Sequence, residues 1–460
     1  MVINYLKSLD DLDKLTFPKN EMFLLKIIGG NDLFHPQITG PVISIFSIGR
    51  NNIYVVNHLH DEYYKIKSDD FFYKLSEKIR ENKFNFIVEL KKSLHYFPDF
   101  ININFHDREV YNYSHNGIIP EDNNHENTFF YRDRNSSGLN IIIPITKHVE
   151  KFRDISIDHL SQEYIGLYEP GYLSLVRRII PFLFKIERHG LNIDQEEFKT
   201  HFGYEKLKYT KNGLFYNNYN IFSATGRPSN SIHGINFAAL HKNDGQRKII
   251  TSRFGNDGML VLFDFKAYHP HLLGKLTNFT FPEFTDLYVW LTGEMAKIST
   301  DKQESLKGEV FTQLYGHIDK KYLPIPFYKT VDDFIKNRWV YFKNNGYVDT
   351  PIFSRSISDK HLDNPNPNKV TNYILQAYET ERNCLVMENL YTFLSDKITI
   401  PILYGYDSIL FDFNKNDGKE CLIGINNLMT DGGFKVSIKV GHNFDEMTKI
   451  ELIGAISDNS

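Results

Sequence analysis

The chain has 460 residues, of which 41% are hydrophobic, and it carries a formal net charge of -4 and two cysteines. This length predicts two or more domains, the cysteines are too few for a disulfide framework, and the charge gives no global signal for nucleic acid. The longest apolar runs are far shorter than the roughly 20 residues that span a bilayer, and Met1 to Leu25 is too charged for a signal peptide, so we expect a cytoplasmic protein without a membrane partner.

The first part of the chain predicts an α/β layout. Strand patterns bounded by Gly and Asn turns occur at 23–28, 42–46 and 53–56. Residues 70–86 have helical periodicity and lead into a further strand pattern at 86–88. Residues 107–137 are polar, lack periodicity and predict a long loop.

A new pattern begins at Tyr172, from which apolar and basic residues alternate at helical spacing up to Arg188. Gly190 ends this helix, and an extended segment follows it. The stretch from Arg227 to Arg253, which includes Arg247, carries a local excess of positive charge. An enzyme with a DNA groove needs only such local charge, although a solvated loop has the same composition.

Two apolar strand patterns lead to an aspartate. Residues 259–263 precede Asp264, and residues 400–404 precede Asp407, which lies at the turn of a predicted hairpin. Carboxylates on adjacent strand ends can hold two Mg²⁺ ions about 3.5–4 Å apart, with Mn²⁺ as an alternative, as metal-dependent phosphoryl transfer requires. A single strand-terminal aspartate often only caps a turn, so the candidate catalytic and metal site rests on the pair.

A regular spacing of i, i+4, i+8 and i+9 lies between these aspartates, at Lys307, Phe311, Tyr315 and Gly316. This spacing predicts a helix with one cation and two rings on the same face, ended by the glycine. Such a face can present a cation to phosphates and rings to a base. Because an aromatic stripe more often belongs to a core, the surrounding motifs must decide between the two interpretations.

These segments, in this order, resemble motifs A, B and C of the family A DNA polymerases, the DNA polymerase I family. Asp264 with its preceding strand resembles motif A, the helix with Lys307 resembles motif B, and Asp407 resembles motif C. The segment Ser223-Ala-Thr-Gly-Arg227 resembles the family's Thr-Gly-Arg segment, whose arginine reaches the minor groove near the primer terminus. The resemblance extends over roughly Tyr172 to Asp445.

The resemblance assigns roles to individual residues. Those that it places at the incoming nucleotide are Lys307, Phe311, Tyr315, Tyr268, His269 and Gln303. Those that it places at the primer and template are Arg227, Asn372 and Gln376. Arg247 is a further candidate DNA contact because it lies in the basic stretch. The catalytic residues are Asp264 and Asp407, which imply two Mg²⁺ ions as cofactors.

Three positions depart from the family pattern. His269 stands where motif A has a glutamate that blocks the ribose 2′-hydroxyl, so His269 and Tyr268 are expected to form the sugar gate. Gln303 stands where an arginine usually precedes the motif B lysine, and Ser408 follows Asp407 where the family has a glutamate. A serine after the motif C aspartate also resembles the motif of single-subunit RNA polymerases, so an RNA polymerase or primase-like enzyme is the enzymatic alternative. The non-enzymatic alternative is a catalytically silent DNA-binding scaffold.

The resemblance implies an α/β fold in three parts. Residues 1–176 form a degenerate 3′–5′ exonuclease-like domain, residues 177–222 a connector and a vestigial, truncated thumb, and residues 223–460 a palm and fingers domain with its fingers at about 276–358. The exonuclease fold needs an Asp-x-Glu pair on its first strand. Residues 23–28 contain no acid, so this domain is expected to be inactive.

The implied function is template-directed synthesis of DNA, in which dNTPs are added to a primer 3′-hydroxyl by two-metal-ion phosphoryl transfer without proofreading. Primed DNA and dNTPs are the expected partners, and a processivity or replisome protein is a further one. The compact chain and its composition point to a phage or mobile element, in which case the protein works in the cytoplasm of the host cell.

Overall fold

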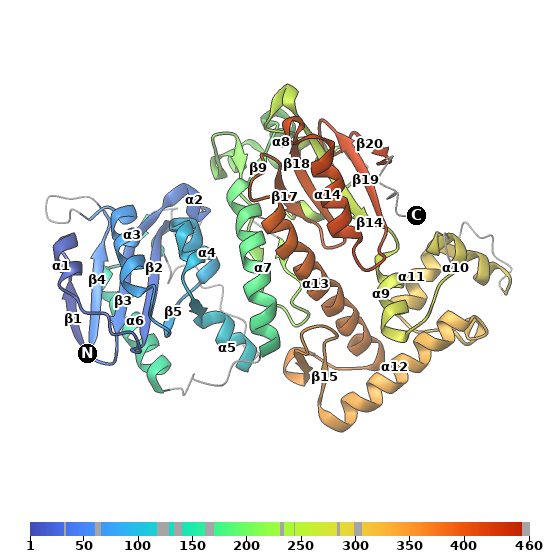
Figure 1. The fold of residues 1–460 in the computed structure, drawn as a ribbon, viewed down its shortest axis with the longest axis horizontal. Coiled ribbons are helices and arrows are strands. Elements are labelled where there is room, and N and C mark those ends of the chain that lie inside the picture. The colour runs from blue at the N-terminus through green and yellow to red at the C-terminus, as the bar shows by residue number, and fades with distance from the viewer. Residues whose placement is uncertain are drawn as a thin grey trace, which may run out of the picture. The chain divides into compact units, whose positions relative to one another are not determined.

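The computed structural model describes residues 1–31, 34–59, 66–116, 128–132, 140–161, 170–230, 234–242, 244–282, 286–298 and 306–452. It is a mixed α/β structure, as the sequence predicts, and it divides into two compact units (Figure 1). The first unit comprises Met1–Glu169, Leu183–Gly190 and Phe202–Asn218, and the second comprises Pro170–Phe182, Leu191–His201 and Tyr219–Ser460. The helix α7 (Pro170–His189) contributes to both units. None of the described helices is long and apolar enough to cross a membrane.

The first unit is built on one sheet with the strand order β1-β4-β3-β2-β5-β6, and β7 pairs with both β2 and β8. Its strands are β1 (Val2–Tyr5), β2 (Phe23–Asn31), β3 (Pro41–Ile48), β4 (Asn52–Asn57), β5 (Asn85–Ile87), β6 (Phe105–Asp107), β7 (Thr128–Arg132) and β8 (Asn140–Ile142). The middle strands β2, β3 and β4 are antiparallel, whereas β5 runs parallel to β2. The four strands predicted in this part of the chain are therefore confirmed by β2, β3, β4 and β5.

The helices of the first unit pack on this sheet. They are α1 (Leu9–Asp13), α2 (Pro36–Thr39), α3 (Ser68–Ile79), α4 (Leu90–Tyr96), α5 (Arg108–Asn116) and α6 (Ile145–Ser161). The core gathers apolar side chains from the sheet together with Val149 and Phe152 of α6. The helix predicted at 70–86 is confirmed by α3, which ends earlier, at Ile79.

The prediction of a long loop at 107–137 is wrong, because α5 and β7 lie within it. Asp107 accepts hydrogen bonds from the backbone N–H groups of Glu109 (2.9 Å) and Val110 (3.4 Å), as a residue that starts a helix does. Val110, Tyr111 and Tyr113 of this helix are buried. The polar composition of the segment hid both the cap and this short apolar face.

The second unit is built on a five-stranded antiparallel sheet with the order β17-β18-β14-β19-β20. Its strands are β14 (Gly258–Phe265), β17 (Ile400–Tyr404), β18 (Ser408–Asn414), β19 (Val436–Gly441) and β20 (Met447–Ile450). The central strand β14 is almost wholly buried because it has a neighbour on each side and helices over the sheet. The two strands predicted to precede Asp264 and Asp407 are confirmed by β14 and β17.

Helices surround this sheet and extend beyond it. They are α9 (Tyr268–Thr277), α10 (Leu287–Ala296), α11 (Leu306–Tyr315), α12 (Pro326–Asn345), α13 (Pro367–Phe393) and α14 (Gly418–Thr430), with the hairpin of β15 (Tyr347–Asp349) and β16 (Ser356–Ser358) after α12. The long helix α13 packs against α9, α12 and α14, and α10 packs against α11 (Figure 1). Smaller elements before β14 are β9 (Leu191–Asn192), α8 (Gln195–Phe202), β10 (Thr210–Lys211), β11 (Leu214–Phe215), β12 (Tyr219–Asn220) and β13 (Ser229–Asn230).

A buried aspartate fixes the segment that leads into β14. Asp412 of β18 is fully buried and lies opposite Leu260 of β14. It accepts hydrogen bonds from the Ser252 hydroxyl (2.6 Å) and from both the backbone N–H and the Nε of Arg253 (3.0 Å each). A buried carboxylate is tolerated only when such donors replace its water, so these contacts hold the segment before β14 against β18.

We predict that Asp412→Ala destabilises the chain by about 3–5 kcal/mol, because it leaves Arg253 without its buried partner. Chemical denaturation of the variant measures the loss. Asp396→Ala is the matched control, because Asp396 is exposed and its ion-pair partner among the described residues is the neighbouring Lys397, and it should leave the free energy of unfolding unchanged. Equal stability of Asp412→Ala and the wild type would contradict the structural role of Asp412.

Candidate active site

The central sheet of the second unit brings Asp264 and Asp407 together. Asp264 is the seventh residue of β14 and lies opposite Ser408 of β18 and Ser437 of β19. Asp407 directly precedes β18, and its carbonyl accepts a hydrogen bond from the N–H of Phe265 at 2.8 Å. Two acids that are 143 positions apart in the sequence are therefore neighbours across adjacent strands.

The turn that carries Asp407 has a strained backbone. Tyr406 has a φ of 70°, a left-handed conformation that costs a bulky residue roughly 1–3 kcal/mol. Its carbonyl accepts a hydrogen bond from Nδ2 of Asn383 at 2.6 Å, and the N–H of Gly405 donates to the carbonyl of Ser408 at 2.8 Å. Strain of this kind persists only where the surroundings enforce it, and it is common at functional sites.

The electrostatics of the two acids are those of a cation site. Burial, together with the negative charges of Asp264 and Glu379, raises the pKa of Asp407 to about 6, against the pull of Arg227. Burial also raises the pKa of Asp264, which the positive charges of surrounding lysine and arginine side chains oppose. Two carboxylates that repel each other in a half-dry site have the charge and the oxygen donors that a hard divalent cation needs. The donor set therefore fits Mg²⁺ or Mn²⁺.

Basic residues lie around Asp264. The side chains that lower its pKa are Lys439, Lys242 and Arg247. The guanidinium of Arg247 stacks over the ring of Phe444 at 4.5 Å, and its Nε donates to the carbonyl of Leu240 at 3.1 Å. Arg247, predicted from its basic stretch to contact DNA, thus lies in the electrostatic field of the acids, where a phosphate would also find positive charge.

The predicted face of α11 is exposed. Lys307 and Phe311 are solvent-exposed and Tyr315 is half-buried, whereas the buried residues of this helix are Leu306, Val310, Gln313 and Leu314. The rings of Phe311 and Tyr315 are parallel, with centroids 6.2 Å apart. The stripe is therefore not part of the core. Gln303, the remaining candidate of this region, lies outside the described residues.

Tyr288 links this face to the aspartates. Nζ of Lys307 lies 5.5 Å from the centroid of its ring, and the ring of Phe311 is 5.4 Å away. Burial raises the pKa of Tyr288 to about 12, and the nearby charges of Asp407 and Asp264 contribute to the rise. The sequence interpretation did not include Tyr288, because a tyrosine at the start of an apolar helix carries no distinctive signal.

His269 and Tyr268, the two predicted gate residues, lie in different surroundings. The Tyr268 side chain is buried, its ring stacks on Phe265 at 4.2 Å, and its hydroxyl donates to Oδ1 of Asn383 at 2.6 Å. His269 instead contacts the hydroxyl of Tyr315 through Nδ1. The structure thus places His269 beside Tyr315 of α11, whereas Tyr268 is buried against Phe265 and α13.

One face of α13 contributes the remaining contacts. Asn372 donates from Nδ2 to the carbonyl of Tyr315 at 2.7 Å, and Gln376 is half-buried one turn further along the helix. Glu379 follows and lies 3.4 Å from both Arg227 and His269. Sequence reasoning missed Glu379, although the spacing of polar residues at 372, 376, 379 and 383 repeats every three or four positions and marks one face of a helix.

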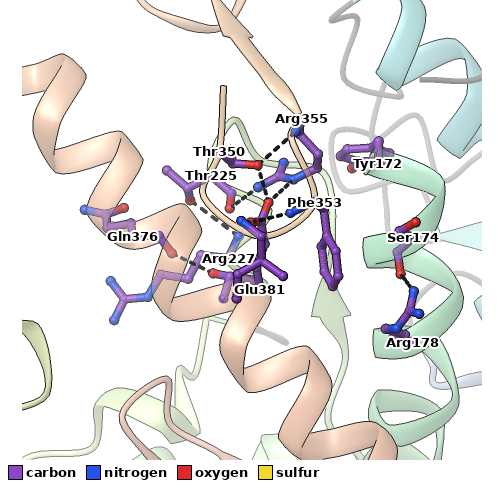
Figure 2. A network of polar contacts seen from close by, with 12 residues as sticks. Tyr172, Ser174, Arg178, Thr225, Arg227, Thr350, Phe353, Arg355, Gln376 and Glu381 are labelled. Carbon is purple, nitrogen blue, oxygen red and sulfur yellow. Dashed lines mark hydrogen bonds and ion pairs between the residues drawn. The ribbon is translucent and has the colours of Figure 1, made fainter. Parts of the chain in front are cut away.

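The turn that carries Arg227 is fixed by a buried ion pair (Figure 2). Arg355 donates from Nη2 to the carbonyl of Thr225 and from Nε to Oε1 of Glu381, both at 2.9 Å. Glu381 of α13 also accepts hydrogen bonds from the N–H groups of residues 352 and 353. Gly226, between Thr225 and Arg227, has a φ of 72°, and a Cβ there would lie 2.6 Å from a methyl group of Leu175. Only glycine therefore fits this turn.

The first unit has a cation where an exonuclease site would need acids. Lys26 of β2 is 2% exposed, and burial lowers its pKa to about 8. The described acids whose charges act on it are already engaged, since Glu89 pairs with Lys92 and Glu109 with Arg108.

A second polar cluster in the first unit is formed by His35, His95 and Glu187, whose possible ligand atoms lie within 4.8 Å of one another. Nε2 of His95 lies 2.9 Å from Oε2 of Glu187, and the ammonium of Lys91 contacts the other carboxylate oxygen. Lys91 therefore already neutralises Glu187, and the cluster is balanced in charge without a metal ion.

Comparisons with known proteins bear on the fold. The chain is similar to a solved structure described as the POL domain of Pol1 from M. smegmatis in complex with DNA primer-template and dNTP. The match has a TM-score of 0.70 and 12% sequence identity, and it covers 93% of this chain and 96% of the other. No family model and no curated protein matches the sequence. At this identity the likeness establishes the fold, which is that of a DNA polymerase I type polymerase domain.

Proposed function

We propose that this chain is a template-directed DNA polymerase of the family A type, which adds dNTPs to a primer 3′-hydroxyl. The observation that supports this most strongly is the convergence of Asp264 and Asp407 on adjacent strand ends, opposite an exposed cation and rings on α11. The structurally similar protein is described as bound to DNA primer-template and dNTP, and these are the partners that we propose here.

Asp264 and Asp407 would hold the metal ions, two Mg²⁺ with Mn²⁺ as an alternative. Divalent ions bound there would favour ionisation of the primer hydroxyl and neutralise charge on the triphosphate. The chain itself supplies two carboxylates with raised pKa, whose mutual repulsion a bound cation would offset. The strained turn at Tyr406 fixes the direction of the second carboxylate.

The nucleotide would lie against α11. Lys307 is exposed and free to approach a triphosphate, and the parallel rings of Phe311 and Tyr315 offer a stacking surface to a base. His269 contacts the hydroxyl of Tyr315, and its ring would exclude a ribose 2′-hydroxyl. Tyr268, buried next to His269, would complete the gate, and Gln303 remains a predicted phosphate contact.

The primer and template would lie along Arg227, Arg247, Asn372 and Gln376. Arg227 stacks over the ring of Tyr406 at 3.8 Å, next to the catalytic Asp407, which suits a contact with the primer terminus. Arg247 adds positive charge beside Asp264. Phosphate contacts of this kind would position the duplex rather than read its sequence.

We further propose that the first unit is a degenerate exonuclease and that the thumb is vestigial. The buried Lys26 on β2 supports the first point, because a cation repels the metal ions that two-metal hydrolysis requires. Among the described residues between 190 and 257, the longest helix is α8 with eight residues, which supports the second point. A short thumb neutralises few phosphates, so synthesis should be distributive unless a processivity or replisome protein assists. A phage or mobile-element origin and a cytoplasmic location remain predictions.

We predict that Asp264→Ala and Asp407→Ala each abolish primer extension, by at least about a thousandfold, while binding of primed DNA changes little. A gel-based extension assay with dNTPs and fluorescence anisotropy with a labelled primer-template measure the two properties. Retained extension in both variants would exclude this site. Equal use of NTPs by the wild type would favour the RNA polymerase alternative instead.

We predict that metal binding is lost as the pH falls through about 6. Asp407 is protonated below its raised pKa, so a cation must displace a proton, and the apparent affinity should fall about tenfold for each further pH unit. Titration calorimetry with Mn²⁺ between pH 5 and 7.5 tests this. The Asp407→Asn variant should bind Mn²⁺ weakly at every pH. A wild-type affinity for Mn²⁺ that does not vary with pH would argue against Asp407 as a ligand.

We predict that the purified chain does not remove a mismatched 3′ nucleotide. Incubation of a mismatched primer-template with Mg²⁺ and no dNTP should leave the primer intact, because strand β2 of the exonuclease-like unit carries Lys26 and no acid. Primer shortening that persists in the Asp407→Ala variant would show that an active exonuclease site exists.

A further inference from the structure

We propose that Glu379 is a positioning residue whose single carboxylate holds both Arg227 and His269, and thereby couples the grip on the primer terminus to the selection of the nucleotide sugar. This inference rests on the proposed polymerase function for the roles of its two partners. It concerns a residue that the motif resemblance does not assign.

The geometry gives each carboxylate oxygen its own cation or donor. Glu379 is 1% exposed on α13. Its Oε2 lies 3.4 Å from Nε of Arg227, and its Oε1 lies 3.4 Å from Nε2 of His269. A buried carboxylate is stable only with such partners, so Glu379 and its two partners must be placed together.

The first partner connects Glu379 to the catalytic turn. The guanidinium of Arg227 lies over the ring of Tyr406, the residue before Asp407. The backbone of the Arg227 turn is held separately, through the contact of Arg355 with Thr225. Because the backbone has its own anchor, Glu379 acts on the direction of the Arg227 side chain rather than on the fold of the turn.

The second partner connects Glu379 to the nucleotide face. A carboxylate opposite Nε2 favours a proton on that nitrogen, so in the neutral ring Nδ1 is the acceptor for the hydroxyl of Tyr315. Glu379 thus sets both the orientation and the tautomer of His269. The sugar gate is then a relay from Glu379 through His269 to Tyr315, which stands on α11.

The contacts of Glu379 with Arg227 and His269 are longer than good hydrogen bonds and can shorten. Oε2 of Glu379, Nε of Arg227 and Nε2 of His269 are buried, and each lacks a hydrogen-bond partner of good geometry among the described residues. At 3.4 Å they attract one another without being fully bonded. A movement of a few tenths of an ångström by either partner strengthens its contact and weakens the other, so a carboxylate shared in this way couples the two sites.

The test is a pair of double-mutant cycles. Glu379→Gln keeps the shape of the side chain and removes its charge. We expect it to weaken binding of a 3′-recessed primer-template in metal-free buffer, and to lower the ratio of kcat/KM for dNTP over NTP, each by about tenfold. Glu379→Gln should add nothing to the binding defect of Arg227→Ala, and nothing to the lost sugar selection of His269→Ala.

The matched control is Glu388→Gln, which removes another glutamate of α13 that pairs with an arginine, Arg178, at an exposed position. It should leave both quantities unchanged. If Glu379→Gln does not fold, Glu379→Asp retains the charge, withdraws the carboxylate by one methylene, and should give the same two non-additive patterns.

Several results would overturn the proposal. Additive effects in both cycles would show that Glu379 acts independently of Arg227 and His269. A uniform fall in kcat or in melting temperature, with unchanged DNA affinity and sugar ratio, would mark Glu379 as structural only. If the wild type binds primed DNA without extending it, the proposed polymerase function fails while the binding cycle still decides the role of Glu379. A wild type that binds no primed DNA would overturn both.

Discussion

The candidate active site depends on the burial of polar side chains along α13. Glutamate, arginine and asparagine residues that rarely enter a protein interior are buried within a short stretch of this helix, namely Glu379, Glu381, Arg382 and Asn383. Each would cost several kcal/mol if it were left without partners. The chain avoids this cost only if other segments bring matching donors and acceptors to the helix, so these side chains dictate where those segments lie.

The segments that supply donors and acceptors to these buried side chains of α13 are the same segments that form the candidate site. Asn383 contacts the hydroxyls of Tyr268 and Tyr404 and the carbonyl of Tyr406, which joins the helix after β14 to the turn before β18. Arg382 donates to the carbonyls of Met429 and Asp431 at the end of α14. Asp264 and Asp407 are brought together by the sheet, but the parts around them are aligned by one helix.

The sequence predicts those parts of the site that are encoded locally. Apolar runs that end in an acid reveal Asp264 and Asp407, because a buried strand has a recognisable composition and its end is exposed to the site. The direction of Tyr268 could not be predicted in this way. Ala267 adopts a left-handed φ of 47° before α9, and this bend turns Tyr268 into the core and leaves His269 at the surface of the site.

Partners that meet only in three dimensions were also missed. Glu379 and Tyr288 owe their places to residues far away in the sequence, and the buried Lys26 owes its low pKa to a fold that no local pattern contains. The loop prediction for 107–137 was wrong for a local reason. A short helix with one cap and a narrow apolar face has the same composition as a polar loop. These limits follow from tertiary packing overriding composition.

The charges around His269 illustrate how a fold can be retained at low sequence identity. The family that the sequence resembles has a glutamate at the position of His269, and in this chain Glu379 of α13 lies 3.4 Å from the His269 ring. A carboxylate is therefore still present near Tyr315, but an imidazole separates the two and the carboxylate comes from another helix. A charge is required at a location in space, not at a particular position of the sequence, so different elements can supply it. Pairwise constraints of this kind preserve a site while the sequence around it diverges.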